Sequence, residues 1–203
     1  SEEARFNRFS LGVYELGSVM KIVNTAAALE SGKMGVNDFF DASRPLKIGN
    51  FTISDLHAEN RWLSMPEVFL YSSNIASARM AFTMGSDFQH NFICKLGLCA
   101  PVPIEIKELG RPQLPPMAHW PEISSATVAF GHGISITPLH LVRATAAAIN
   151  GGILVTPSLI KQPEANAPKG ERVMSERASH DMRRIMRVNV THPDGTGKSA
   201  EVA

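Results

Sequence analysis

The sequence lacks the features that mark several large classes of protein. Positive and negative charges nearly cancel over 203 residues, and the formal net charge of +1 is too small a basic excess to favour nucleic acid. No apolar run is long enough to span a bilayer, and no signal-peptide pattern stands at the start. We therefore expect no nucleic-acid partner and no membrane-spanning segment within these residues.

Metal-ligating residues are also sparse. Cys94 and Cys99 are the only cysteines, so they could form at most one disulfide, and no second pair of ligands completes a metal site around them. We expect both to be free, buried small residues. The seven histidines are scattered, without the His-Glu-x-x-His helix typical of zinc enzymes. Neither a metal nor a cofactor is predicted.

One short stretch, Ser18-Val19-Met20-Lys21, carries a chemical signal. Lys21 is the only charge in an apolar helical run from Val19 to Leu29, and burial would lower the pKa of its amine toward neutrality. A spacing of three residues on a helix places the Ser18 hydroxyl on the same face as that amine. The pair has the composition of a nucleophile beside its activator. The simpler alternative is that Ser18 caps the helix while Lys21 extends to water.

The same pattern occurs a second time, as Ser158-Leu159-Ile160-Lys161. This copy follows Pro157 in a β-rich stretch, where residues three apart point to opposite faces. We interpret it as an ordinary strand end. The tetrapeptide by itself is therefore weak, and its context decides between the two copies.

Caps and periodicity predict the remaining elements. A capping box at Ser64-Met65-Pro66-Glu67 begins one helix, and Thr137-Pro138 begins another that continues through Ala148. The predicted class is α+β. Its other expected parts are short strands with loops over Asp41–Ile53, helices over Ile75–Met84 and Asp87–Leu98, a proline-rich loop region over Pro101–Pro121, strand-like residues over Gly152–Ile160, and a last helix capped by Ser175.

A cluster of small polar residues, Ser72-Ser73-Asn74, lies at the turn between two predicted helices. Such residues are usually caps. Beside a buried serine and lysine they could also supply a hydroxyl that relays a proton and an amide that orients the base. The sequence leaves both interpretations open.

Together these motifs resemble those of class B penicillin-binding proteins, and most closely the cell-division (septal) group. The resemblance rests on Phe6–Ser10, Val13–Lys21, Tyr71–Asn74 and Ala129–Leu139, in matching order and spacing along essentially the whole chain. It implies a β-lactamase/transpeptidase-like fold, with helices packed on an antiparallel sheet. It also implies a periplasm-facing D,D-transpeptidase of the inner membrane that cross-links peptidoglycan stem peptides ending in D-Ala-D-Ala, is acylated by β-lactams and works with cell-division proteins.

The resemblance also implies roles for individual residues. Ser18 would be the nucleophile and Lys21 its general base, and the Ser18 backbone N–H would supply half of an oxyanion hole. Ser72 would relay a proton to the leaving group, and Asn74 would orient Lys21 and the substrate amide. Ser73 occupies the variable position of its motif and receives no role.

The chain departs from the family pattern in one large respect. The third motif of the family, a Lys-Thr-Gly strand, does not occur, although Gly195–Ala200 resembles the loop that precedes it. We therefore expect residues 1–203 to be a partial transpeptidase domain, without anchor, pedestal or third-motif strand, and inactive when isolated. Two alternatives stay open: a serine β-lactamase or β-lactam sensor, which would need a second base for water that no residue supplies, and a catalytically silent structural module.

Overall fold

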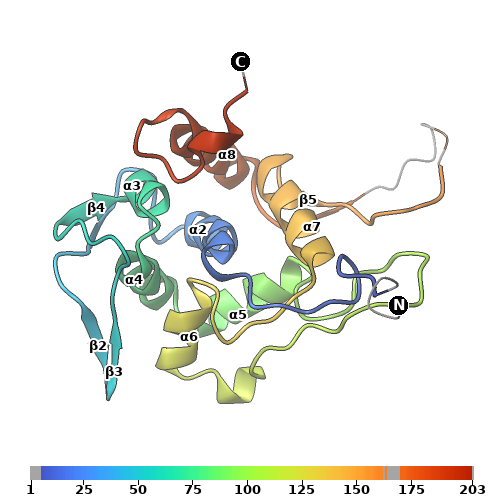
Figure 1. Ribbon diagram of the computed structural model, residues 1–203, viewed down its shortest axis with the longest axis horizontal. Helices are drawn as coiled ribbons and strands as arrows, with labels where there is room; N and C mark the ends of the chain where they lie inside the picture. The colour runs from blue at the N-terminus through green and yellow to red at the C-terminus, as the bar shows by residue number, and fades with distance from the viewer. Residues whose placement is uncertain (1–5, 162, 164–169, 203) are drawn as a thin grey trace.

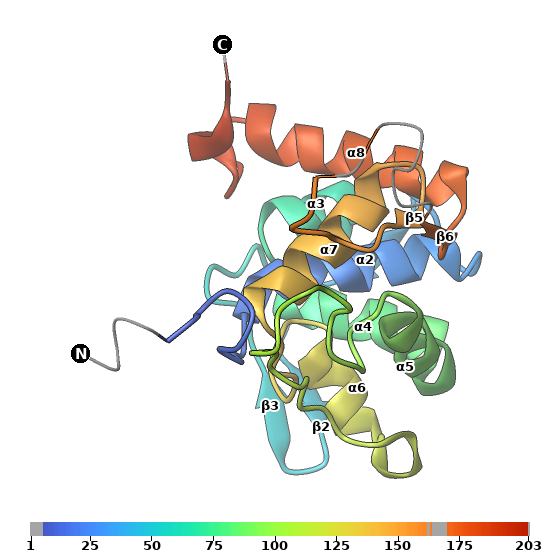
Figure 2. The same ribbon diagram turned by 90° about the vertical axis from the view of Figure 1, so that its right-hand side faces the viewer.

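The computed structural model describes residues 6–161, 163 and 170–202. Helix α2 (Lys21–Glu30) lies at the centre of these residues, with α8 (Glu176–Thr191) and α7 (Pro138–Ile149) on one side and α4 (Asn74–Met84) and α5 (Ser86–Lys95) on the other, as Figures 1 and 2 show. Neighbours thus cover most faces of α2. The remaining helices are α3 (Met65–Leu70), α6 (Glu122–Val128) and the short 3₁₀ helices η1 (Gly17–Met20), η2 (Met117–His119) and η4 (Lys198–Ala200).

Small side chains allow this close packing around α2. Ala26, Ala27 and Ala28 have no exposed surface, and Met20 and Val23 join them in the main hydrophobic core. Because an alanine adds little width to a helix, the backbones of neighbouring helices can approach α2 on several sides. The helix that begins just after Ser18 is therefore held rigidly.

The strands form three two-stranded antiparallel sheets in the described part of the chain. Strand β1 (Phe39–Asp41) pairs with β4 (Trp62–Ser64), β2 (Leu46–Ile48) with β3 (Phe51–Ile53), and β5 (Ile153–Leu154) with β6 (Glu171–Arg172). The predicted α+β class is confirmed. Most of the core is built from helices, and the small sheets lie around it (Figure 1).

Most predicted helix ends are confirmed by local geometry. Both halves of the capping box at Ser64 and Glu67 are formed, and Thr137 and Ser175 accept N-cap hydrogen bonds from His140 and Ala178. Gly85 ends α4 with a φ of 89°, a conformation that glycine adopts without strain. These helix ends could be predicted from the sequence because each cap involves residues within one helical turn.

Two expectations are wrong. Cys94 and Cys99 are not free, because they form a disulfide that joins α5 to the loop after it. The strand expected over Gly152–Ile160 is reduced to β5, since the chain leaves its partner β6 after two residues. The proline-rich region over Pro101–Pro121 is loop as predicted, apart from the short η2 near its end, and α6 follows directly after Pro121.

Candidate active site

The Ser18 turn is built by two glycines from distant parts of the chain. Gly17 adopts a φ of 57°, which turns the chain into η1 and leaves the Ser18 side chain exposed. Gly131 lies against this turn so closely that a Cβ atom there would come within 2.0 Å of the Gly17 carbonyl oxygen. Because Gly131 has no side chain, the glycine-rich loop can pack directly beside Ser18.

An acidic residue fastens that loop to the segment before Ser18. Glu15 accepts a hydrogen bond of 2.9 Å from the Gly133 backbone N–H, and its other oxygen lies 3.2 Å from His132 Nδ1. These contacts, the Gly133 hydrogen bond first, lower the pKa of the Glu15 carboxyl. Tyr14 and Ile136 add an antiparallel bridge on the same side. Residues 131–136 therefore form a fixed support for the serine turn.

Lys21 projects from the first turn of α2 into a polar cluster. Only 3% of its surface is exposed, so the alternative in which it extends to water is wrong. Its Nζ lies 3.0 Å from Ser18 Oγ, 2.9 Å from Ser72 Oγ, 2.8 Å from the Ser72 carbonyl oxygen and 2.7 Å from Asn74 Oδ1. The fold thus places three of the predicted site residues, Ser18, Ser72 and Asn74, around the amine nitrogen of the fourth, Lys21.

These contacts restrict where the protons of a neutral Lys21 amine can be. The Ser72 carbonyl and Asn74 Oδ1 only accept hydrogen bonds, and the Asn74 amide is oriented by its Nδ2, which donates to the Ser54 carbonyl at 3.1 Å. The two amine hydrogens therefore point to these acceptors. The nitrogen lone pair is left for a hydroxyl proton of Ser18 or Ser72.

Burial lowers the pKa of Lys21 to about 8, against an ordinary value of 10.5, and the negative charge of Asp55 opposes the shift. The direction expected from the sequence is confirmed. A lysine with this pKa is neutral in roughly one molecule in ten at pH 7 and in about half at pH 8. The amine can therefore accept a proton without a strong external base.

Asp55 is a site residue that sequence reasoning missed. One of its oxygens accepts from Ser73 Oγ at 2.7 Å, and the other accepts from the backbone N–H groups of Asn74 at 2.5 Å and Ile75 at 3.0 Å. These are the free N–H groups at the start of α4, so the carboxylate caps that helix. No local pattern marks Asp55, because it precedes the residues it binds by about twenty positions.

The capped turn holds Ser72 in an unusual conformation. Its φ of 54° lies in the left-handed region, which non-glycine residues seldom adopt and which surrounding contacts must stabilise. In this conformation both its hydroxyl and its carbonyl face Lys21. Ser73 instead caps α4 and is buried, in agreement with the absence of a predicted chemical role.

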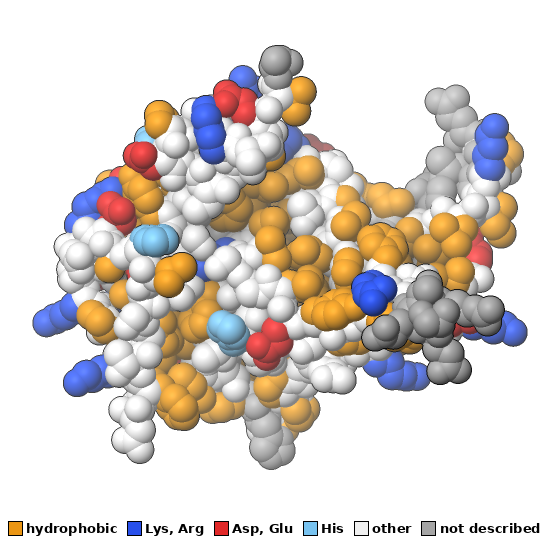
Figure 3. Space-filling view, in the orientation of Figure 1, with side chains coloured by type: hydrophobic (Ala, Val, Ile, Leu, Met, Phe, Trp, Pro, Cys, Tyr) orange, Lys and Arg blue, Asp and Glu red, His pale blue; other side chains and the backbone are white. Residues whose placement is uncertain are grey.

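A cleft of about 500 Å³ opens beside Ser18, Lys21 and Ser72. Its apolar wall is formed by Val19 of η1, Ile22 of α2, Phe69 of α3, and Met186 and Val190 of α8. Asn189, Thr196, Gly197 and Ala200 complete the lining. Figure 3 shows hydrophobic side chains gathered below the C-terminal segment on this face of the molecule.

Neither the second Ser-x-x-Lys motif nor the two cysteines form a catalytic or metal site in the described residues. Ser158 lies in an irregular exposed segment where its hydroxyl donates to Glu105 and the Ile160 carbonyl, so the second Ser-x-x-Lys does not form a comparable cluster. Within the described residues, His90, Cys94 and Cys99 are close enough to share a metal, but the two sulfurs are joined in the disulfide. Ser18 and Lys21 remain the centre of the candidate site.

Comparison with known families agrees with this geometry. The family described as the penicillin binding protein transpeptidase domain matches residues 2–203. The chain belongs to this family. It is 38% identical to the probable peptidoglycan D,D-transpeptidase FtsI of Caulobacter vibrioides, over all of this chain and 34% of that protein. It is 31% identical to the probable peptidoglycan D,D-transpeptidase PenA of Neisseria meningitidis, over 98% of this chain and 34% of that protein.

Solved structures show the same fold. The apo structure of the TP domain from Burkholderia pseudomallei penicillin-binding protein 3 superposes with a TM-score of 0.92 at 27% identity, covering 98% of this chain and 60% of that one. The family assignment from the motifs is thus confirmed, as is the transpeptidase-like fold. The chain spans about a third of the length of the curated relatives it matches.

Proposed function

We propose that the protein containing this domain is a peptidoglycan D,D-transpeptidase that works through a serine acyl-enzyme and is acylated by β-lactams. Support comes from the family, from relatives named as peptidoglycan D,D-transpeptidases, and from the Lys21 cluster. The observation that carries most weight is the 3.0 Å contact between the buried, pKa-lowered Lys21 amine and the exposed Ser18 hydroxyl.

The proposed reaction begins when Lys21 takes the proton of Ser18 as Oγ attacks the carbonyl carbon of the penultimate D-Ala. The tetrahedral intermediate then expels the terminal D-Ala, whose amine receives a proton through Ser72. The Ser18 backbone N–H, at the start of η1, stabilises the developing oxyanion. An amino group of a second stem peptide attacks the acyl-enzyme, which forms the cross-link and frees Ser18. Asn74 orients Lys21 and the substrate amide throughout.

The direct test is intact-mass analysis of the full-length protein after incubation with benzylpenicillin. A single penicilloyl adduct located on Ser18, and absent from Ser18→Ala, is expected. Unchanged labelling of the Ser18→Ala variant would remove Ser18 from its proposed role. Incubation of the unlabelled enzyme with a D-Ala-D-Ala peptide and a D-amino acid acceptor then tests transfer.

A serine β-lactamase or β-lactam sensor is the alternative function. Hydrolysis of the acyl-enzyme needs a base to activate water, and no Asp or Glu lines the cleft within the described residues. The nearby Asp55 is occupied, with both oxygens engaged at the start of α4. A penicilloyl adduct that persists for many minutes supports the transpeptidase, whereas rapid turnover would establish the hydrolase.

We place this activity in septal cell-wall synthesis, on the periplasmic side of the inner membrane. The support is the similarity to a protein named FtsI. The substrates would be stem peptides ending in D-Ala-D-Ala, and the partners would be cell-division proteins. None of the helices in the described segments is both long and apolar enough to cross a membrane. Labelling of the full-length protein in intact cells, followed by imaging, tests the septal location.

A further inference from the structure

Helices α2 and α4 are joined by two side-chain hydrogen bonds that lie one helical turn apart. Lys21 Nζ donates to Asn74 Oδ1 at 2.7 Å, and Asn24 Nδ2 donates to the Ser77 carbonyl at 3.1 Å. Both pairs are 53 residues apart in sequence, so a step of three residues along α2 matches an equal step along α4. The two helices therefore run side by side in the same direction here, and the Asn24 contact fixes the register of the Lys21 contact.

The Asn24 side chain is costly to bury. Only 4% of its surface is exposed, and its Oδ1 has no hydrogen-bond partner among the described residues. The Ser77 carbonyl does not need the Asn24 amide, because it lies inside α4 and the helix itself supplies it with a backbone N–H. A half-satisfied amide in the core therefore adds little to stability, and a role in positioning explains it better.

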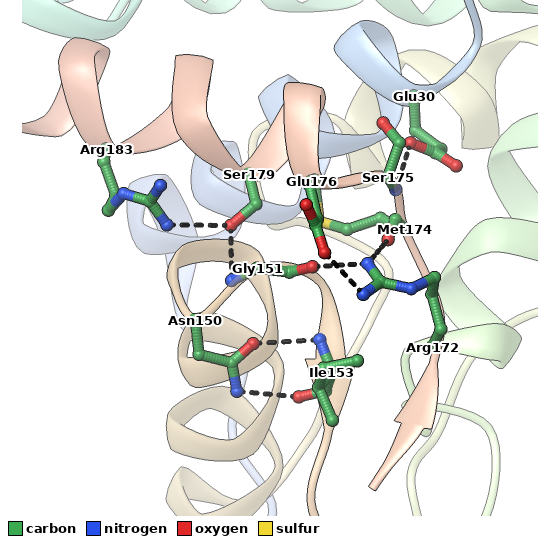
Figure 4. A network of polar contacts seen from close by, with 10 residues as sticks. All are labelled: Glu30, Asn150, Gly151, Ile153, Arg172, Met174, Ser175, Glu176, Ser179 and Arg183. Atoms are coloured by element: carbon green, nitrogen blue, oxygen red, sulfur yellow. Dashed lines mark hydrogen bonds and ion pairs between the residues drawn. The ribbon is translucent and has the colours of Figure 1, made fainter.

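Two further contacts hold the opposite end of α2 and the segment that follows it. Glu30 accepts from the Ser175 N–H at the start of α8 at 2.8 Å, as Figure 4 shows. Lys33 Nζ donates to the Met84 carbonyl at the end of α4 at 3.0 Å. Glu30 is more than two helical turns, about 13 Å along the axis, from the residue that carries the proposed base. These contacts fix the general position of α2, whereas Asn24 lies one turn from the base and adjusts its fit against α4.

We propose that Asn24 is a positioning residue for acylation, which keeps α2 in register with α4 so that the Lys21 amine stays at hydrogen-bond distance from the Ser18 hydroxyl. This inference rests on the proposed acyl-enzyme function. Asn24 is buried in the core, so it acts through Lys21 rather than on the substrate. Because proton transfer is sensitive to displacements of about 1 Å, a small slide of α2 along α4 slows the chemical step without changing substrate binding.

The test measures acylation of the full-length protein by a fluorescent penicillin, with the dissociation constant of the noncovalent complex resolved from the first-order acylation step. Asn24→Leu keeps the branched shape of the side chain and removes its amide. Its melting temperature should equal or exceed that of the wild type, because an unpartnered buried oxygen is lost, while its acylation step should slow about tenfold. The dissociation constant should stay unchanged. Asn24→Ala covers the case in which leucine does not fit: it should lower the melting temperature by leaving a cavity, and slow the acylation step of the folded molecules to a similar extent.

Lys33→Met is the matched control, since it removes a hydrogen bond to the far end of α4 and keeps the aliphatic part of the side chain. It should leave both constants unchanged. A merely structural role for Asn24 would lower the melting temperature and the labelled fraction but leave the acylation step of the folded enzyme intact. A wild-type acylation step in either folded Asn24 variant, a weakened complex in place of a slower step, or an equal slowing in Lys33→Met overturns the inference. Failure of the wild-type protein to label on Ser18 overturns the proposed function instead.

Discussion

The carboxylate of Asp55 accepts a 2.7 Å hydrogen bond from Ser73 Oγ across 18 residues of sequence. Its other oxygen binds the first N–H groups of α4, so this one side chain fixes the turn that presents Ser72 and Asn74 to Lys21. The left-handed backbone of Ser72 depends on that turn staying closed.

Removal of the Asp55 carboxylate should loosen this turn. Asp55→Ala leaves two N–H groups and a buried hydroxyl without their acceptor, so we expect a loss of about 2 kcal/mol in the free energy of unfolding. Acylation of Ser18 should fall as well, because Ser72 and Asn74 are no longer held. Urea unfolding and penicillin labelling measure the two effects. Asp38→Ala, which removes a surface contact to Gly35, serves as control, and an equal effect there would contradict the specific role of Asp55.

The acylation rate should rise with pH. Lys21 must be neutral to accept the Ser18 proton, and its pKa is lowered to about 8 by burial. The rate constant is therefore expected to increase about tenfold between pH 6 and 7 and to level off above pH 8. Lys21→Ala should fold, acylate slowly and lose this dependence. A rate that stays flat across this range in the wild-type protein would exclude Lys21 as the base.

The same pKa shift affects stability in a defined window. Between about 8 and 10.5 the unfolded chain holds a proton on Lys21 that the folded protein has released, so stability from this residue rises with pH in that interval. Below pH 8 both states are protonated and the contribution is constant. Lys21→Met, which keeps the aliphatic length, should lose this part of the slope in urea unfolding measured at several pH values. An unaltered slope would contradict the assigned pKa.

The two cysteines should be unreactive in the native protein. Since Cys94 and Cys99 form a disulfide, a thiol reagent is expected to find no free thiol before reduction and two after it. Replacement of both by serine should cost roughly 2 kcal/mol, the value for closing so short a loop. Two reactive thiols in the unreduced, unfolded chain would restore the expectation of free cysteines.

The effect of the close contact between Gly131 and the Gly17 carbonyl can be measured separately from the effect of a positive φ. Gly131→Ala should be strongly destabilising, because its Cβ would lie 2.0 Å from the Gly17 carbonyl oxygen in addition to the strain of a φ of 90°. Gly133→Ala is the matched control, with a φ of 75° and its nearest contact at 3.6 Å, so only the left-handed strain of about 1 kcal/mol applies. Penicillin labelling should fall for Gly131→Ala alone. Equal losses in the two variants would show that the close contact has no special importance.

Local sequence patterns were sufficient to predict many features of this protein. The caps at Ser64, Thr137 and Ser175, the stop at Gly85 and the lowered pKa of Lys21 each depend on neighbours within a few residues, or on the apolar character of one helix. The motifs around Ser18 and Ser72 were specific enough to predict the family that the comparisons then confirmed.

Only the folded chain revealed contacts between residues far apart in sequence. Asp55 caps a helix that begins about twenty residues later, and Gly131 packs against Gly17. No propensity encodes such pairs, since each depends on how rigid helices pack around α2. The chemistry of the serine and lysine was therefore visible in the sequence, whereas the residues that hold them in place were determined by packing.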